Sequence, residues 1–283
     1  MFHFRNTTTA ATACLQDPGA NDSVNPGANK NMALREAIMA NKLHIVDLLL
    51  ADKCVDPCAS NNAAILIAAR TGRHEIVQRL LRDGRADPSA ENNSAICEAS
   101  RLGHFAVVDC LLGDARVDPA DNNNAAIRAA THSSRASVVK RLLEDPRVNP
   151  TTNDNAAIIH AACIGNTEAV EYLLGDARVD PSADDSAAFR YAACWGHLEV
   201  VNRLMLDPRV DPSAKNNDAI SRAAQNKHTE IVTRLLGDMR VLRALEPANG
   251  APPEIIRPLV CAAAWRRRRA IVCAHAMYWA NDF

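Results

Sequence analysis

A 31-residue period is the feature of this sequence that most constrains its fold. The period is marked by an Asp-Pro or Asn-Pro step, which begins at Asn25, Asp56, Asp87, Asp118, Asn149, Asp180 and Asp211. With this residue counted as repeat position 1, seven repeats without insertions run from 25 to 241. Such a period predicts one small supersecondary unit stacked seven times, rather than a chain wrapped around a single core.

Two apolar stripes recur inside every repeat. Positions 9 and 13 are always Ala, position 22 is always Val, and positions 25 and 26 are Leu-Leu except for Met205. Spacings of three and four residues mark one side of a helix, so the stripes predict two short helices per repeat. Gly at position 17 in four repeats predicts a left-handed end to the first helix. Asn at position 7, replaced once by Ser186, predicts the N-cap of that helix.

The repeat resembles the ankyrin repeat. The family's T-P-L-H-x-A segment aligns with 63–68, its Gly-His with Gly103-His104 and Gly196-His197, its Leu-Leu with Leu111-Leu112, and its Val-Asn turn with Val148-Asn149. The Thr and His of T-P-L-H are absent throughout, and the repeat is two residues shorter than the usual period. The resemblance covers about three quarters of the chain. It implies an all-α ankyrin-type solenoid of stacked helix-turn-helix units with short connecting turns, whose first helices line a concave groove that binds partners.

The ends of the chain depart from the repeat. We expect a frayed segment or partial repeat over 1–24, seven repeats over 25–241, and a degenerate helical cap over 242–283. A solenoid needs a terminal cap with a polar outer face. Leu259, Val260, Ile271 and Val272 are expected to pack on the seventh repeat, with the Arg266–Arg269 run facing water.

Composition and motifs exclude several classes of protein. A net charge of -1, no apolar run of membrane length and no apolar N-terminal segment predict a cytoplasmic protein, with the nucleus as the alternative, and no membrane or nucleic-acid partner. The phosphate-loop, nucleophile-elbow and metal-ligand motifs are missing, so we expect a non-enzymatic monomer without cofactor, metal or small-molecule substrate. Cys163 and Cys194 share position 15, but stacked helices about 8–10 Å apart disfavour a shared zinc or a disulfide.

The variable side of the first helix predicts the binding surface. Positions 11, 12, 15 and 16 avoid both stripes and hold Trp, Tyr and Arg, which are enriched at binding hot spots. The candidates, centred on repeats 4 to 6, are Leu66, Arg70, Arg101, Leu102, Arg128, His132, His160, Ile164, Arg190, Tyr191 and Trp195. Alternatively, packing between repeats hides some of them. By contrast, Asp recurs at position 28 in all seven repeats and Arg at position 30 in six, which favours structural roles. The three His residues at position 18, His104, His197 and His228, are expected to be structural loop residues.

The leading hypothesis is a protein–protein interaction scaffold that binds its partner through the groove. The alternative is a substrate-recruiting adaptor of a ubiquitin ligase, because Pro253, Glu254, Ile255, Ile256 and Leu259 look like the start of an F-box. A third hypothesis is nucleic-acid or nuclear-import binding through Arg266–Arg269, for which a steep salt dependence would be diagnostic.

Overall fold

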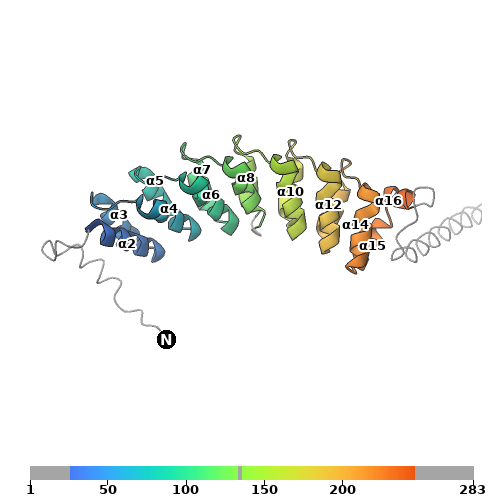
Figure 1. Ribbon diagram of the computed structural model, residues 1–283, viewed down its shortest axis with the longest axis horizontal. Helices are drawn as coiled ribbons and strands as arrows, with labels where there is room; N and C mark the ends of the chain where they lie inside the picture. The colour runs from blue at the N-terminus through green and yellow to red at the C-terminus, as the bar shows by residue number, and fades with distance from the viewer. Residues whose placement is uncertain (1–25, 133–135, 246–283) are drawn as a thin grey trace, which may run out of the picture. The chain divides into compact units, whose positions relative to one another are not determined.

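The computed structural model describes residues 26–132 and 136–245, and their side chains from residue 31 onward. Two compact units divide the chain between Asn149 and Pro150. We call their described parts the N-terminal unit (26–149) and the C-terminal unit (150–245), and describe each by itself (Figure 1). Within these ranges every regular element is a helix, as the sequence predicts.

From α2 to α15, even-numbered helices are the first helices of the repeats and odd-numbered helices are the second helices. The N-terminal unit holds α2 (Pro26–Met39), α3 (Leu43–Ala51), α4 (Ala59–Arg70), α5 (His74–Asp83), α6 (Ala90–Leu102), α7 (Phe105–Leu112), α8 (Asp121–Ala130) and α9 (Ser137–Leu143). The C-terminal unit holds α10 (Thr152–Ile164), α11 (Thr167–Gly175), α12 (Ala183–Trp195), α13 (Leu198–Met205), α14 (Ala214–Gln225), α15 (Thr229–Leu235) and α16 (Met239–Ala244).

Within each unit, first helices pack on first helices and second helices pack on second helices. In the N-terminal unit α4 packs between α2 and α6, and α6 packs on α8, while α3, α5, α7 and α9 follow one another in the same way. In the C-terminal unit α12 packs between α10 and α14, and α13 between α11 and α15. This arrangement confirms the all-α ankyrin-type solenoid that the resemblance implies.

The core is a series of thin layers built from small side chains. The Ala at position 13, the Val at position 22 and the Leu at position 25 are buried in all seven repeats. Among the residues whose side chains the structure describes, Phe189 is the largest that is fully buried. Because Ala lets helix backbones approach closely, each layer needs few large residues, which explains a chain that is only 4% aromatic.

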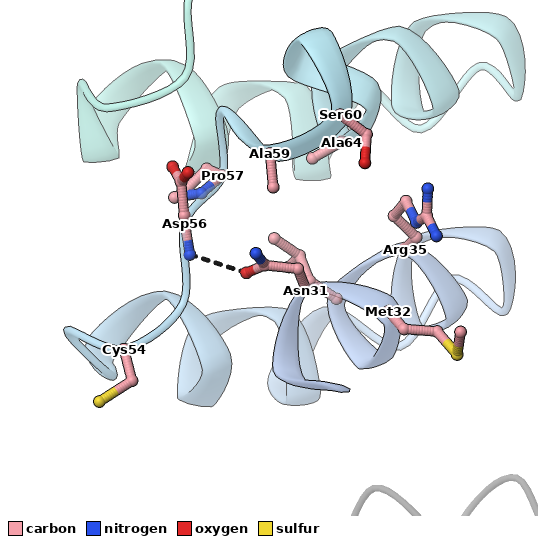
Figure 2. Close-up of a pocket in the computed structure, with 10 residues that line it drawn as sticks. Asn31, Met32, Arg35, Cys54, Asp56, Pro57, Ala59, Ser60 and Ala64 are labelled. Atoms are coloured by element: carbon pink, nitrogen blue, oxygen red, sulfur yellow. Dashed lines mark hydrogen bonds between the residues drawn. The ribbon is translucent and has the colours of Figure 1, made fainter. Parts of the chain in front are cut away.

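The residue at position 7 joins neighbouring repeats, so its predicted role as an N-cap is wrong. Positions 5 to 7 of repeats 2 to 7 have left-handed backbone, and fourteen of these eighteen residues are Asn or Asp, the types that tolerate it best. At position 7 the side chain points to the next repeat rather than to its own helix. Asn31 Oδ1 accepts from the Asp56 backbone N–H at 2.8 Å (Figure 2), and Asn93 Oδ1 accepts from the Asp118 N–H at 2.8 Å.

We call the hydrogen bond that a position-7 side chain accepts from the first backbone N–H of the next repeat the position-7 lock. Within the described ranges, repeat 7 has no such lock. Ser186 Oγ still accepts from the Asp211 N–H at 3.0 Å, but the buried Oδ1 of Asn217 has no hydrogen-bond partner among the described residues. The donor that would match it, the Leu242 N–H, instead bonds Asp238 O inside α16. The chain therefore leaves the repeat pattern at Leu242.

The recurring Asp, Arg and His residues are structural, as predicted. Arg147 pairs with Asp145 at 2.7 Å and donates to Val117 O and Leu112 O of the preceding repeat, both at 2.9 Å. His197 binds the Cys163 carbonyl of the preceding repeat through Nε2 at 3.0 Å. These contacts fasten each turn to the repeat before it.

Candidate interaction surface

The predicted surface residues divide between the two units. In the N-terminal unit Arg70, Arg101, Leu102 and His132 are exposed, while Leu66 and Arg128 are half-buried. In the C-terminal unit Trp195 and Ile164 are exposed, His160 and Tyr191 are half-buried, and Arg190 is buried. Each set is described separately below.

The N-terminal set is dominated by paired charges. Arg101 lies 2.8 Å and Arg70 3.7 Å from the carboxylate of Glu98, so two candidate cations share one anion. The hydrogen bond from Arg101 lowers the pKa of Glu98 and keeps it ionised. Arg128 donates to Asn123 O at 3.3 Å and to Asn122 O at 3.1 Å, the carbonyls of its own left-handed turn. These guanidinium groups are already engaged, which weakens the case for them as anchors.

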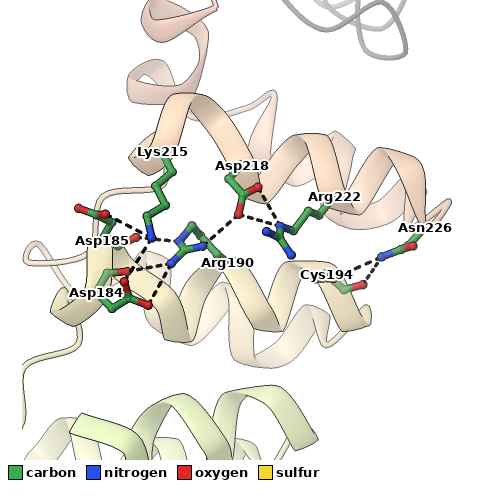
Figure 3. A network of polar contacts seen from close by, with 8 residues as sticks. All are labelled: Asp184, Asp185, Arg190, Cys194, Lys215, Asp218, Arg222 and Asn226. Carbon is green, nitrogen blue, oxygen red and sulfur yellow. Dashed lines mark hydrogen bonds and ion pairs between the residues drawn. The ribbon is translucent and has the colours of Figure 1, made fainter. Parts of the chain in front are cut away.

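Arg190 does not face a partner, contrary to prediction. It is 4% exposed and donates to Asp184 O at 2.8 Å and Asp185 O at 3.0 Å, the same use of position 11 seen at Arg128. It also pairs with Asp218 of the next repeat at 3.1 Å (Figure 3). Carboxylates on both sides draw the guanidinium into the interface between repeats 6 and 7.

The network around Arg190 continues across α14. Burial alone would raise the pKa of Asp218, but hydrogen bonds from Arg222 and Arg190 lower it below its ordinary value. Lys215 lies 3.2 Å from Asp184, so the cluster holds both signs of charge (Figure 3). The cluster is internally balanced and fastens two repeats together.

Trp195 and Ile164 form the main apolar feature of the C-terminal set. Trp195 is 60% exposed and Ile164 is 40% exposed. They are the last residues of α12 and α10, at the same repeat position, on two helices that pack together. Tyr191 lies one turn before Trp195 in α12, and the Arg190 guanidinium sits 5.8 Å from its ring centre. We call Ile164, Tyr191 and Trp195 the aromatic surface.

The Cys163 thiol beside the aromatic surface is not activated. Burial raises the pKa of the Cys163 thiol above its ordinary value of 9.0, and a side-chain hydrogen bond from Trp195 opposes this only in part. Cys194 Sγ lies 3.4 Å from Asn226 Nδ2, and both cysteines are free. In the N-terminal unit burial raises the pKa of Cys97 to about 11. A neutral thiol is a poor nucleophile and a poor metal ligand, so binding by shape fits this surface better than covalent chemistry.

A separate hollow lies between α2 and α4, where the sequence predicts no site. It encloses about 450 Å³ and is lined by Met32, Arg35, Ser60 and the lock between Asn31 and Asp56 (Figure 2). No signal in the repeat pattern points to it, because it arises from side chains of two repeats. Across the described ranges no group of three or more His, Cys, Asp or Glu side chains could hold a metal ion. None of the described helices is long and apolar enough to cross a membrane.

Comparison with known proteins gives the family. The family model described as ankyrin repeats (3 copies) matches residues 4–92, 65–154, 96–185, 127–216 and 158–246. The chain belongs to the ankyrin repeat family. Its structure is similar to the crystal structure of the ankyrin repeat domain of Bcl-3, a member of the IkappaB protein family, with 20% sequence identity and a TM-score of 0.56. The match covers 71% of this chain and 97% of that domain, and at this identity it shows the fold alone. No curated protein matches the sequence.

Membership of this family defines the class of protein. Ankyrin repeats form a protein-interaction fold that is typically not enzymatic, so the chain is a protein–protein interaction scaffold. The F-box-like residues 253–259 and the Arg266–Arg269 run lie outside the described residues.

Proposed function

We propose that this scaffold binds a protein partner through the aromatic surface of the C-terminal unit, without catalysis. The observation that carries the proposal is the 60% exposure of Trp195. The equivalent residues in repeats 2 and 7 are Thr71 and Asn226, so the repeat does not need an indole at this position. A large exposed aromatic side chain on a well-packed helix offers a partner much contact area at little entropic cost.

Neighbouring groups prepare the aromatic surface for binding. Ile164 supplies apolar area one repeat away, and Tyr191 adds an amphipathic ring one turn away. Buried Arg190 holds the start of α12 against α14 and leaves no unpaired charge under the surface. A partner with an apolar pocket for the indole, and with polar groups around that pocket, fits this arrangement.

The test is Trp195→Ala in the intact protein. Partners are first identified by affinity purification of the wild type, and their affinity for both forms is then measured by calorimetry. Loss of a hot-spot aromatic side chain costs at least about 2 kcal/mol, so the Kd should rise roughly thirtyfold. Thermal stability should change little, because small polar residues occupy this position in other repeats.

Phe105→Ala provides the matched control. Phe105 is 45% exposed at the start of α7 in the N-terminal unit and is not one of the residues of the aromatic surface. Its truncation should leave the Kd unchanged. Equal affinities of wild type and Trp195→Ala would remove the aromatic surface from the binding site.

A further inference from the structure

Exposed carboxylates accompany the aromatic surface. Glu168, Glu199 and Glu230 occupy repeat position 20 in the first turns of α11, α13 and α15, and all three are exposed. We call them the acidic row. None of the three makes an ion pair with a described residue. Because α13 packs on both α11 and α15, the carboxylates are placed one per repeat along the unit.

The acidic row lies close to the aromatic surface. Glu199 follows Trp195 by four residues, and Glu168 follows Ile164 by four. Four residues span at most about 14 Å even when extended, and the tight turn between Trp195 and Glu199, in which the Leu198 N–H bonds Gly196 O, brings them nearer. The surface therefore offers apolar side chains beside a line of unpaired negative charge.

The chain itself carries a segment of the complementary chemistry. Residues 150–245 hold thirteen acidic and ten basic residues, whereas residues 246–283 hold five Arg and three acidic residues. Four of these Arg, Arg266–Arg269, stand between the apolar runs 259–265 and 270–280. We call residues 259–280 the basic tail; it lies outside the described residues.

The basic tail is long enough to reach the aromatic surface. The last described residue, Leu245, is buried next to α16, which packs on α14 of repeat 7. Thirteen residues lie between Leu245 and Leu259, and the fourteen Cα–Cα steps that join them span up to about 45–50 Å. Trp195 lies one repeat back from α14, and stacked helices are about 8–10 Å apart.

We propose that the basic tail docks on the aromatic surface of its own chain. Its apolar residues cover Trp195 and Ile164, and Arg266–Arg269 lie along the acidic row. The inference rests on the proposed function in one respect: the tail occupies the surface that a partner needs, so a partner must displace it. Docking within one chain gains from a high effective concentration, and its ionic part weakens with salt.

The test measures how accessible Trp195 is in the full-length protein. Trp265→Phe and Trp279→Phe leave Trp195 as the single indole, since the chain has three Trp. Acrylamide quenching of its fluorescence is compared with that of the same protein carrying Arg266–Arg269 replaced by Ser. Quenching should rise about twofold when the tail is released, because a bound anchor residue is desolvated. Replacement of the four Arg by Lys keeps the charge and should leave quenching unchanged.

A reversal of charge on the repeat side checks the same contact independently. Glu168→Lys, Glu199→Lys and Glu230→Lys together should raise quenching as much as loss of the four Arg does. Salt at about 1 M, where the Debye length is about 3 Å, should act in the same direction. Circular dichroism establishes that each variant keeps its helices. Equal quenching with and without the Arg run would overturn the proposal, and quenching that depends on protein concentration would assign the contact to the tail of a second copy instead.

The proposed partner binding and the proposed docking of the basic tail can be refuted independently of each other. If the basic tail does not protect Trp195, the effect of Trp195→Ala on partner affinity still decides the proposed function. If the tail protects Trp195 but Trp195→Ala leaves partner affinity unchanged, the surface serves the intramolecular contact alone.

Discussion

Asn93→Ala removes the lock between repeats 3 and 4 at one buried side chain. Asn93 is 4% exposed; its Oδ1 accepts from the Asp118 N–H and its Nδ2 donates to Asp121 Oδ2, both at 2.8 Å. A neutral hydrogen bond contributes about 1 kcal/mol and a bond to a carboxylate about 2 kcal/mol. The left-handed backbone at Asn93, with φ of 57°, adds about 1 kcal/mol when Asn becomes Ala. We therefore expect the free energy of unfolding to fall by about 4 kcal/mol.

Asn92→Ala separates the lock from the backbone effect. Asn92 has the same φ of 57°, but it is exposed and its side chain makes no hydrogen bond with a described residue. It should cost only the backbone part, about 1 kcal/mol. Urea unfolding followed by circular dichroism gives both values, and hydrogen exchange at the Asp118 amide reports the lock directly. Equal losses in the two variants, or unchanged exchange at Asp118, would refute the reasoning.

Three further predictions concern other contacts between and within repeats. Gly165→Ala should lower Tm more than Gly84→Ala, because both glycines have positive φ but only a Cβ at Gly165 would clash with a side chain, the imidazole ring of His197. Equal Tm losses in the two variants would contradict this. Hydrogen bonds from Arg147 lower the pKa of Asp145. The contribution of the ionised Asp145 to stability is therefore present above the ordinary pKa of 3.8 and is lost as the pH falls through the lowered pKa. Urea midpoints should thus be flat above about pH 5 and fall steeply below pH 3.8; a flat acid limb would exclude this role. Arg190→Ala should cost about 3 kcal/mol in urea unfolding, because it removes the hydrogen bonds of a buried guanidinium to Asp184 O, Asp185 O and Asp218. Arg190→Lys should restore only part of that, since an ammonium cannot replace the planar guanidinium, and a neutral Arg190→Ala would show that the network does not stabilise the fold.

The repeat pattern predicts local structure well because the same residue types recur at the same helix positions in all seven repeats. Ala at position 13 and Val at position 22 define two helix faces in every repeat, and both positions are buried throughout. Gly at position 17 predicts the left-handed helix end found at Gly165, with φ of +83°. These features depend on a helical periodicity of 3.6 residues and on backbone sterics, which act within a few residues of the chain.

Partners across repeats could not be read from the pattern. Asn at position 7 is a good N-cap by type, yet Asn93 bonds a backbone N–H 25 residues later. The recurrence shows that the residue matters, but only stacking brings the next turn within 2.8 Å of its side chain. Arg at position 30 likewise binds carbonyls that lie 30 and 35 residues before it, as Arg147 does.

At the aromatic surface too, the sequence determines some features and the tertiary structure determines others. By itself the sequence determined the fold, the register of the repeats and the first-helix positions that avoid the core. Tertiary structure decided which residues at those positions face solvent: Arg190 turns inward because carboxylates and carbonyls of two repeats surround it, while Trp195, at the end of α12, stays 60% exposed. Local periodicity fixes the side of a helix on which a residue stands. The charges contributed by the next repeat determine where a long side chain goes from there.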